Sequence, residues 1–131
     1  MMVYKCLFVG RIKSKMNVIK PLPSIRLQPL RIYPGWTIKY NKFMDLDPQT
    51  VGPDDAWFYV FTQDLLQMEQ GNILLDLSWY PEGDPNGRYG LELIKNDDWE
   101  APLVDYSSRK KEEIAHYIEK WTWEVDQGRF R

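Results

Sequence analysis

The sequence contains a single cysteine, Cys6, and a single histidine, His116. One cysteine cannot form an internal disulfide, which fits a reducing compartment. One residue of each kind cannot complete the tetrahedral shell of a zinc site, so we predict no zinc centre. A serine or cysteine nucleophile needs an imidazole beside it. His116 falls on the polar side of a predicted helix, so we interpret it as a solvated residue and predict no catalytic residues.

Long apolar runs are also missing. The longest stretches, such as residues 57–61 and 73–75, are far shorter than the roughly 20 residues that span a bilayer. Residues 7–9 are too few for the core of a signal peptide, and no small-residue cleavage site follows them. Neither the Walker spacing nor G-x-G-x-x-G occurs, which argues against nucleotide catalysis. We therefore expect a cytoplasmic protein that binds no membrane and no cofactor.

Acidic residues are absent from residues 1–44, which hold nine of the 17 lysines and arginines. The remainder carries eight basic and 19 acidic residues, a net charge of −11 by subtraction. Such a charge repels nucleic acid and attracts basic partners, although a surface kept soluble by carboxylates is the more common explanation. We expect one basic protein partner and no nucleic acid.

The length and composition favour one folded domain preceded by a tail. With 131 residues, of which 44% are hydrophobic, the chain can bury one core but is too short for two. Residues 1–24 lack a clear period and end in Pro21, Leu22 and Pro23, so we predict a basic, poorly ordered tail. One hypothesis places the true translation start at Met16. Residues 25–131 are predicted to form a single α+β domain.

Alternating segments predict a mostly antiparallel sheet of about four to six strands. Apolar and polar residues alternate in residues 36–43, 73–80 and 88–94, and a short apolar segment covers residues 103–106. Residues 56–72 hold too many consecutive aromatics for one period, so a short helix and a strand with a following turn both remain open.

The best hairpin of the sequence joins residues 73–80 to residues 88–94. Between them, the sequence DPNG at residues 84–87 suits a type I turn, with proline in second place and Gly87 able to take a positive φ. The same four residues lack the alternating ligands and the distal glutamate of a calcium-binding loop. We therefore predict a turn there and no metal site.

One amphipathic helix is predicted at about residues 108–126. Its apolar residues follow the spacing i, i+3, i+4, i+7, i+11 and form one stripe that should pack on the sheet. Ser107 or Ser108 could cap its start, and Gly128 stands just past its end. The stripe consists of Ile114, Tyr117, Ile118, Trp121 and Val125.

The polar side of this helix carries a tryptophan, Trp123. Such a side chain is either shielded by residues 129–131 or a sheet edge, or exposed to a partner. The predicted loop after residue 94 repeats the combination of tryptophan with acidic neighbours. Aromatic side chains beside charges are typical of binding hot spots. The predicted partner-binding residues are Asp97, Asp98, Trp99, Glu119 and Trp123.

Two other interpretations remain open. One is a small-ligand-binding module or a carboxylate-based enzyme with a cleft between sheet and helix, in which Asp76 or Glu92, on the face opposite the core, acts as acid or base. The other is a structural or regulatory protein that self-associates through an exposed strand.

Three runs of sequence carry a resemblance to a known class of protein: PGWTIKYNKFMDLDP (34–48), QDLL (63–66) and DLSWYPEGDPNGRYGLEL (76–93). With the tryptophan-bearing helix that follows, residues 26–126 resemble small bacterial immunity proteins, which protect a cell from polymorphic or contact-dependent toxins. The resemblance implies a non-enzymatic cytoplasmic inhibitor that occludes the active site of one toxin with an acidic aromatic face. It carries over no functional residue, because these families share no catalytic site, and the basic residues before Met16 depart from the pattern.

Overall fold

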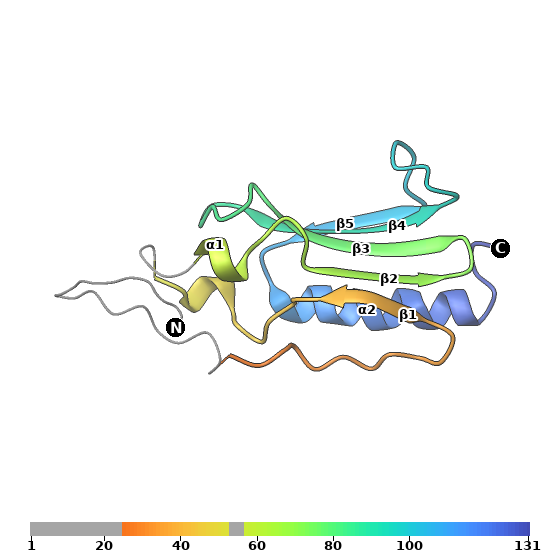
Figure 1. The fold of residues 1–131 in the computed structure, drawn as a ribbon, viewed down its shortest axis with the longest axis horizontal. Helices are drawn as coiled ribbons and strands as arrows, with labels where there is room; N and C mark the ends of the chain where they lie inside the picture. Colours follow the sequence, from red (N-terminus) through yellow and green to blue (C-terminus); the bar gives the residue numbers. More distant parts are fainter. Residues whose placement is uncertain (1–24, 53–56) are drawn as a thin grey trace, which may run out of the picture.

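The computed structural model describes residues 25–52 and 57–131, and its centre is a five-stranded antiparallel sheet (Figure 1). The strands lie in chain order, so each pairs with its neighbours in sequence. The tail predicted for residues 1–24 and the start predicted at Met16 fall outside the described residues. The strands are β1 (Thr37–Asn41), β2 (Leu66–Gln70), β3 (Ile73–Tyr80), β4 (Arg88–Lys95) and β5 (Val104–Ser108).

The C-terminal helix α2 (Lys111–Asp126) packs against β4 and β5, which confirms the predicted α+β fold class. Between β1 and β2 lie the short 3-10 helix η2 (Pro48–Thr50) and the four-residue helix α1 (Trp57–Val60). Residues 56–72, for which the sequence allowed either a short helix or a strand, therefore contain one of each, because α1 ends before the alternating residues of β2 begin.

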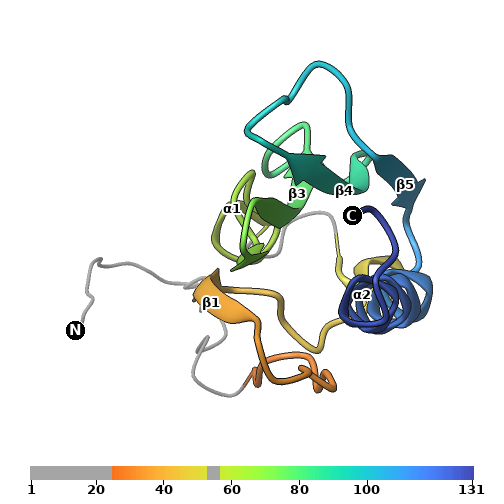
Figure 2. The same cartoon turned by 90° about the vertical axis from the view of Figure 1, so that its right-hand side faces the viewer.

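Viewed from its end, the sheet curves around α2 (Figure 2). Residues 25–36 fill the open side between β1 and α2, and three hydrogen bonds join them to the helix. The Lys111 ammonium donates to the Gln28 side chain at 2.9 Å, and the Arg31 N–H donates to Glu119 at 2.7 Å. The Trp36 indole donates to the carbonyl of Thr122 at 3.3 Å. The segment and the helix therefore run side by side.

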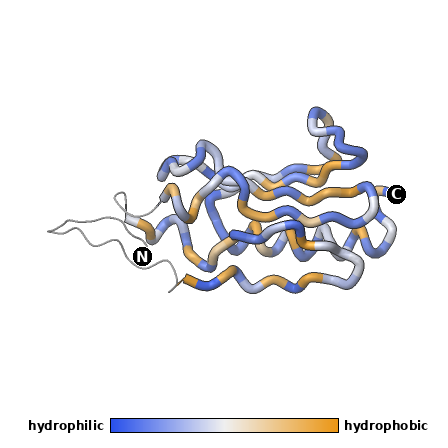
Figure 3. The backbone as a smooth tube through the Cα atoms, viewed as in Figure 1, coloured by the Kyte–Doolittle hydropathy of each residue, from blue (hydrophilic) through white to orange (hydrophobic). Residues whose placement is uncertain are grey.

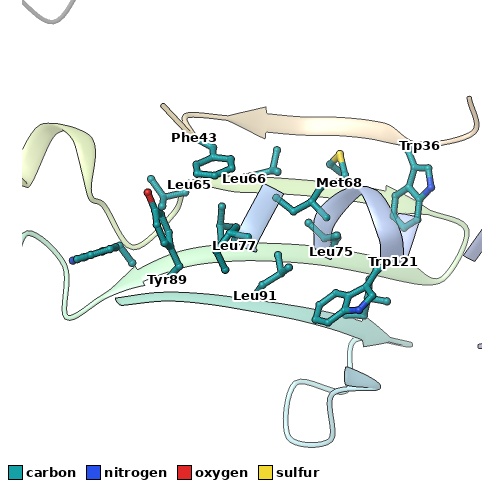
Figure 4. Close-up of a cluster of buried hydrophobic side chains, with 14 of the residues drawn as sticks. Trp36, Phe43, Leu65, Leu66, Met68, Leu75, Leu77, Tyr89, Leu91 and Trp121 are labelled. Atoms are coloured by element: carbon teal, nitrogen blue, oxygen red, sulfur yellow. The ribbon is translucent and has the colours of Figure 1, made fainter. Parts of the chain in front are cut away.

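The hydrophobic core lies between α2 and the concave face of the sheet, called the inner face below (Figure 4). On β3, Ile73, Leu75, Leu77 and Trp79 are all buried, as the period of two predicts. Figure 3 shows the apolar and polar positions alternating along α2. Its buried residues are Ile114, Ile118, Trp121, Thr122 and Val125.

The helix starts differently from the prediction. Ser108 ends β5 and is buried, so α2 begins three residues later than expected, after Lys110, whose side chain makes no capping hydrogen bond. The Ser108 hydroxyl still supports this end, because it accepts from the Lys110 N–H at 2.9 Å and donates to Glu113 at 2.7 Å. Hydrogen bonds from Ser108 and Tyr106 hold the pKa of Glu113 below its usual value.

The turn between β3 and β4 forms where it was predicted, since the Gly87 N–H donates to the carbonyl of Asp84 at 2.8 Å. The expected role of Gly87 is wrong, however, because the positive φ of this loop belongs to Gly83 (φ 70). A Cβ at Gly83 would collide with the Phe58 ring, and one at Gly87 would lie 2.6 Å from the Trp79 indole nitrogen. The close approach of an aromatic ring therefore explains why glycine occupies both positions.

Arg109 fastens this turn to the start of α2. Its guanidinium lies 5.5 Å from the centre of the Trp79 ring and donates to the carbonyls of Pro85, at 2.9 Å, and Gly87. A planar guanidinium can stack on a ring and donate two hydrogen bonds at once, whereas a lysine ammonium cannot.

We therefore expect Arg109→Lys to lower the free energy of unfolding by about 1–2 kcal/mol, because it removes a stacked cation and at least one hydrogen bond. Chemical denaturation of the purified protein would measure the loss. Arg88→Lys is the matched control, since Arg88 is exposed and donates to the neighbouring strand at Ser107. Equal losses in the two variants would contradict the special role of Arg109.

Candidate functional site

The five predicted partner-binding residues lie in two separate places. Asp97, Asp98 and Trp99 are exposed in the loop 96–103 between β4 and β5, whereas Glu119 and Trp123 lie on α2. The loop projects from the side of the sheet that faces away from α2 (Figures 1 and 2). A single compact docking surface therefore cannot include both groups.

Trp99 and Trp123 differ from the other four tryptophans. Each is 46% exposed, whereas the remaining four are at most 8% exposed. The Trp123 ring is therefore exposed, rather than shielded by residues 129–131 or by a sheet edge. The buried tryptophans are Trp36, Trp57, Trp79 and Trp121.

The loop 96–103 is held in place by hydrogen bonds. Asn96 is joined to Asn72 of the neighbouring β2–β3 turn by a backbone bond of 2.9 Å and a side-chain bond of 2.8 Å. Asn96 and Asp97 take positive φ values of 56° and 58°, a conformation that Asn and Asp adopt more readily than most residues. The Asp98 N–H donates to the carbonyl of Lys95 at 3.1 Å. Trp99 is therefore presented by an ordered loop.

The sheet face that points away from α2, called the outer face below, carries a row of three acids. Asp76 on β3 lies directly opposite Glu92 on β4, which lies directly opposite Asp105 on β5. Neighbouring strands are about 4.8 Å apart, and like charges directly opposite each other are destabilising. Within the described part of the chain, no ion pair reaches any member of this carboxylate row.

The pKa values of Asp76 and Glu92 in the carboxylate row reflect burial and nearby negative charge. Burial, aided by the charge of Asp64, raises the pKa of Asp76 above its usual value. Burial also raises the pKa of Glu92, with further contributions from the charges of Asp76 and Asp105. On β1, burial and the charges of Asp76 and Asp64 raise the pKa of Tyr40 to about 12. Among the residues that the structure describes, no cation counteracts these three shifts.

Sequence reasoning missed part of this surface. The sequence places Asp76 and Glu92 on the face opposite the core, as observed, but the expected cleft between sheet and helix is filled by the core. Their outward positions in the alternating strands were the available signal. Asp105 was missed because its pairing depends on the register between β4 and β5.

A group of exposed aromatics was missed as well. Phe58 and Tyr59 on α1 are 71% and 64% exposed, and Tyr80 at the end of β3 is 67% exposed. Phe58 packs over Gly83 of the β3–β4 loop. Of the three, only the exposure of Tyr80 could be predicted from the sequence, because Tyr80 occupies an outward position of its alternating strand.

A shallow cavity of about 200 Å³ lies on α2. Asp76 and Glu92 do not line it, so it does not provide the cleft of the alternative enzymatic interpretation. His116, the only histidine, is exposed at its wall. The five lining residues are Tyr33, His116, Glu119, Lys120 and Trp123.

The described residues contain no group of three or more histidine, cysteine, aspartate or glutamate side chains that could hold a metal ion. In the same part of the chain, no helix is long and apolar enough to cross a membrane. No family model matches the chain, and no curated protein or solved structure matches it either. The resemblance to immunity proteins therefore stays a prediction from the sequence.

The carboxylate row generates a prediction about pH. Because the pKa of Asp76 is raised in the folded state, its ionised form lowers stability at neutral pH, and this loss disappears as the pH falls toward the ordinary value of about 3.9. We expect Asp76→Asn to raise the free energy of unfolding by about 0.5–1 kcal/mol at pH 7. The gain should shrink as the pH approaches about 4.

Urea denaturation at several pH values would measure this gain. Asn retains an oxygen that can accept the 3.0 Å hydrogen bond from Gln67, so the variant removes the charge with little other change. Asp105→Asn is the control and should give a smaller gain, because Asp105 is exposed. A lower free energy of unfolding at pH 7 in Asp76→Asn would show that the charge of Asp76 does not destabilise the folded domain.

Proposed function

We propose that this protein is a non-enzymatic binding protein that acts in the cytoplasm and neutralises a toxin by covering its active site or substrate groove. The proposed contact surface, called the acidic docking face below, lies on the outer face of the sheet and the adjoining loop 96–103. The observation that carries the proposal is the carboxylate row, three acids in register without a cation among the described residues. The acidic docking face consists of Asp76, Glu92, Asp105, Asp97, Asp98 and Trp99.

The carboxylate row is unfavourable in the isolated domain. Local arrangements that reduce stability without a compensating contact tend to occur at functional sites. Lysine or arginine side chains of a partner would lie between these carboxylates and turn their repulsion into attraction. Residues 25–131 hold 12 basic and 19 acidic residues, and their net charge of −7 would also steer a basic partner toward the domain and speed the encounter.

Trp99 supplies the apolar part of the proposed contact. Tryptophan is among the residues that most often dominate the binding energy of an interface. The hydrogen bonds that hold loop 96–103 reduce the conformational entropy that binding would cost. Acids around the ring, at Asp97, Asp98 and Glu100, would keep it selective for a basic surface.

The alternative function, a carboxylate-based enzyme, is favoured by one observation. The pKa values of Asp76 and Glu92 are raised, as general acids require. Because neither residue lines the cavity on α2, the raised pKa values are explained more simply by burial together with the charges of neighbouring carboxylates.

Affinity capture from a native host lysate at about 50 mM salt would test the proposal, with the full chain as bait. We expect the wild type to capture one basic protein. Trp99→Ala should weaken binding about thirtyfold, since a hot-spot tryptophan contributes about 2 kcal/mol. Glu92→Gln combined with Asp105→Asn should weaken it as well, and Trp123→Ala, on the opposite side of the domain, is the matched control that should not.

Two further measurements on the captured protein decide the function. Its affinity for the chain should fall at least about tenfold between 50 and 300 mM salt, because exposed charges are screened. Expressed alone in the host, it should slow growth, and co-expression of the wild-type chain, but not of Trp99→Ala, should restore it. A partner indifferent to salt and to both groups of substitutions would refute the acidic docking face.

A further inference from the structure

The cavity on α2 lies away from the acidic docking face and is built from two elements. Four of its lining residues recur on one face of the helix at the spacing i, i+3, i+4, i+7. The fifth, Tyr33, comes from residues 25–36, which run beside α2. The cavity, called the helix groove below, is therefore an open trough between a helix and an extended segment.

Two aromatic rings border the helix groove. Trp123 is 46% exposed and Tyr33 is half-buried. Neither ring has an aromatic or cationic partner among the residues that the structure describes. The face of an aromatic ring, and of tryptophan most of all, attracts cations.

The charges of the helix groove favour a cation as well. Oε2 of Glu119 accepts the Arg31 N–H at 2.7 Å, and Oε1 has no partner within the described residues. Lys120 also lines the cavity, and its ammonium lies 3.2 Å from the Glu124 carboxylate, which partly offsets its charge because Glu124 also pairs with Arg129. One carboxylate oxygen and two ring faces are therefore available together.

We infer that the helix groove is a second binding site, separate from the acidic docking face, that takes an arginine side chain of another protein. A guanidinium is planar, so it can stack on Trp123 or Tyr33 while one edge donates to Oε1 of Glu119. A lysine ammonium is compact and strongly hydrated, and it fits this combination less well. The inference does not rest on the proposed function, because the two surfaces share no residue.

Acetyl-arginine-amide is the probe, titrated into the full chain while the indole N–H resonance of Trp123 is followed by NMR. Trp123→Phe assigns that resonance. We expect it to shift and saturate at millimolar probe. Acetyl-citrulline-amide has nearly the same shape without the charge, and it should bind at least about fivefold more weakly.

Glu119→Gln should weaken the binding of acetyl-arginine-amide about fivefold, because it removes the negative charge. Its side-chain oxygen can still accept the Arg31 N–H, so the fold should be preserved. Trp99→Ala should leave the titration unchanged, which separates this result from the test of the acidic docking face. Equal binding of the citrulline probe, indifference to Glu119→Gln, or an unmoved Trp123 resonance would each overturn the inference.

Discussion

The packing of α2 against the inner face of the sheet is the contact on which the rest of the structure depends. It buries the inward residues of β3 and β4 together with the apolar stripe of the helix. Because one helix covers one face, the outer face is left mainly to polar side chains, as is usual for antiparallel sheets. The carboxylate row can exist only there, since three unpaired acids could not be accommodated in the core.

The same packing divides the surface into two independent regions. The outer face and loop 96–103 form one region, and the polar side of α2 with residues 25–36 forms the other. Acidic side chains occur in both, but only the first has carboxylates in register across adjacent strands. In the second, Glu119 lines a cavity together with Tyr33 and Trp123, and its Oε1 has no partner within the described residues. The two regions therefore suit different contacts, a broad basic surface and a single side chain.

Features governed by local periodicity could be predicted from the sequence. The strand at residues 73–80 and the apolar stripe of α2 follow from burial on one side, which leaves a period of two or 3.6 residues. Features governed by tertiary contacts could not be. The switch from α1 to β2 within a few residues has no single period, and the distance between Trp99 and Trp123 depends on the side of the sheet from which loop 96–103 projects. Likewise, the alignment of Asp105 with Glu92 required the register of β5.

The strands follow one another in chain order, so the sheet can grow one hairpin at a time as the chain leaves the ribosome. Residues 25–36 are an exception, because they are fixed by hydrogen bonds to residues 83 to 88 positions later. Residues 26–28 also pair locally with residues 43–45, but the contacts with the helix exist only once α2 has been synthesised. The helix groove is thus completed last, so a nascent or C-terminally shortened chain could present the sheet before it presents the groove. Ligand capture at this site would consequently report that residues up to the end of α2 have been synthesised and packed.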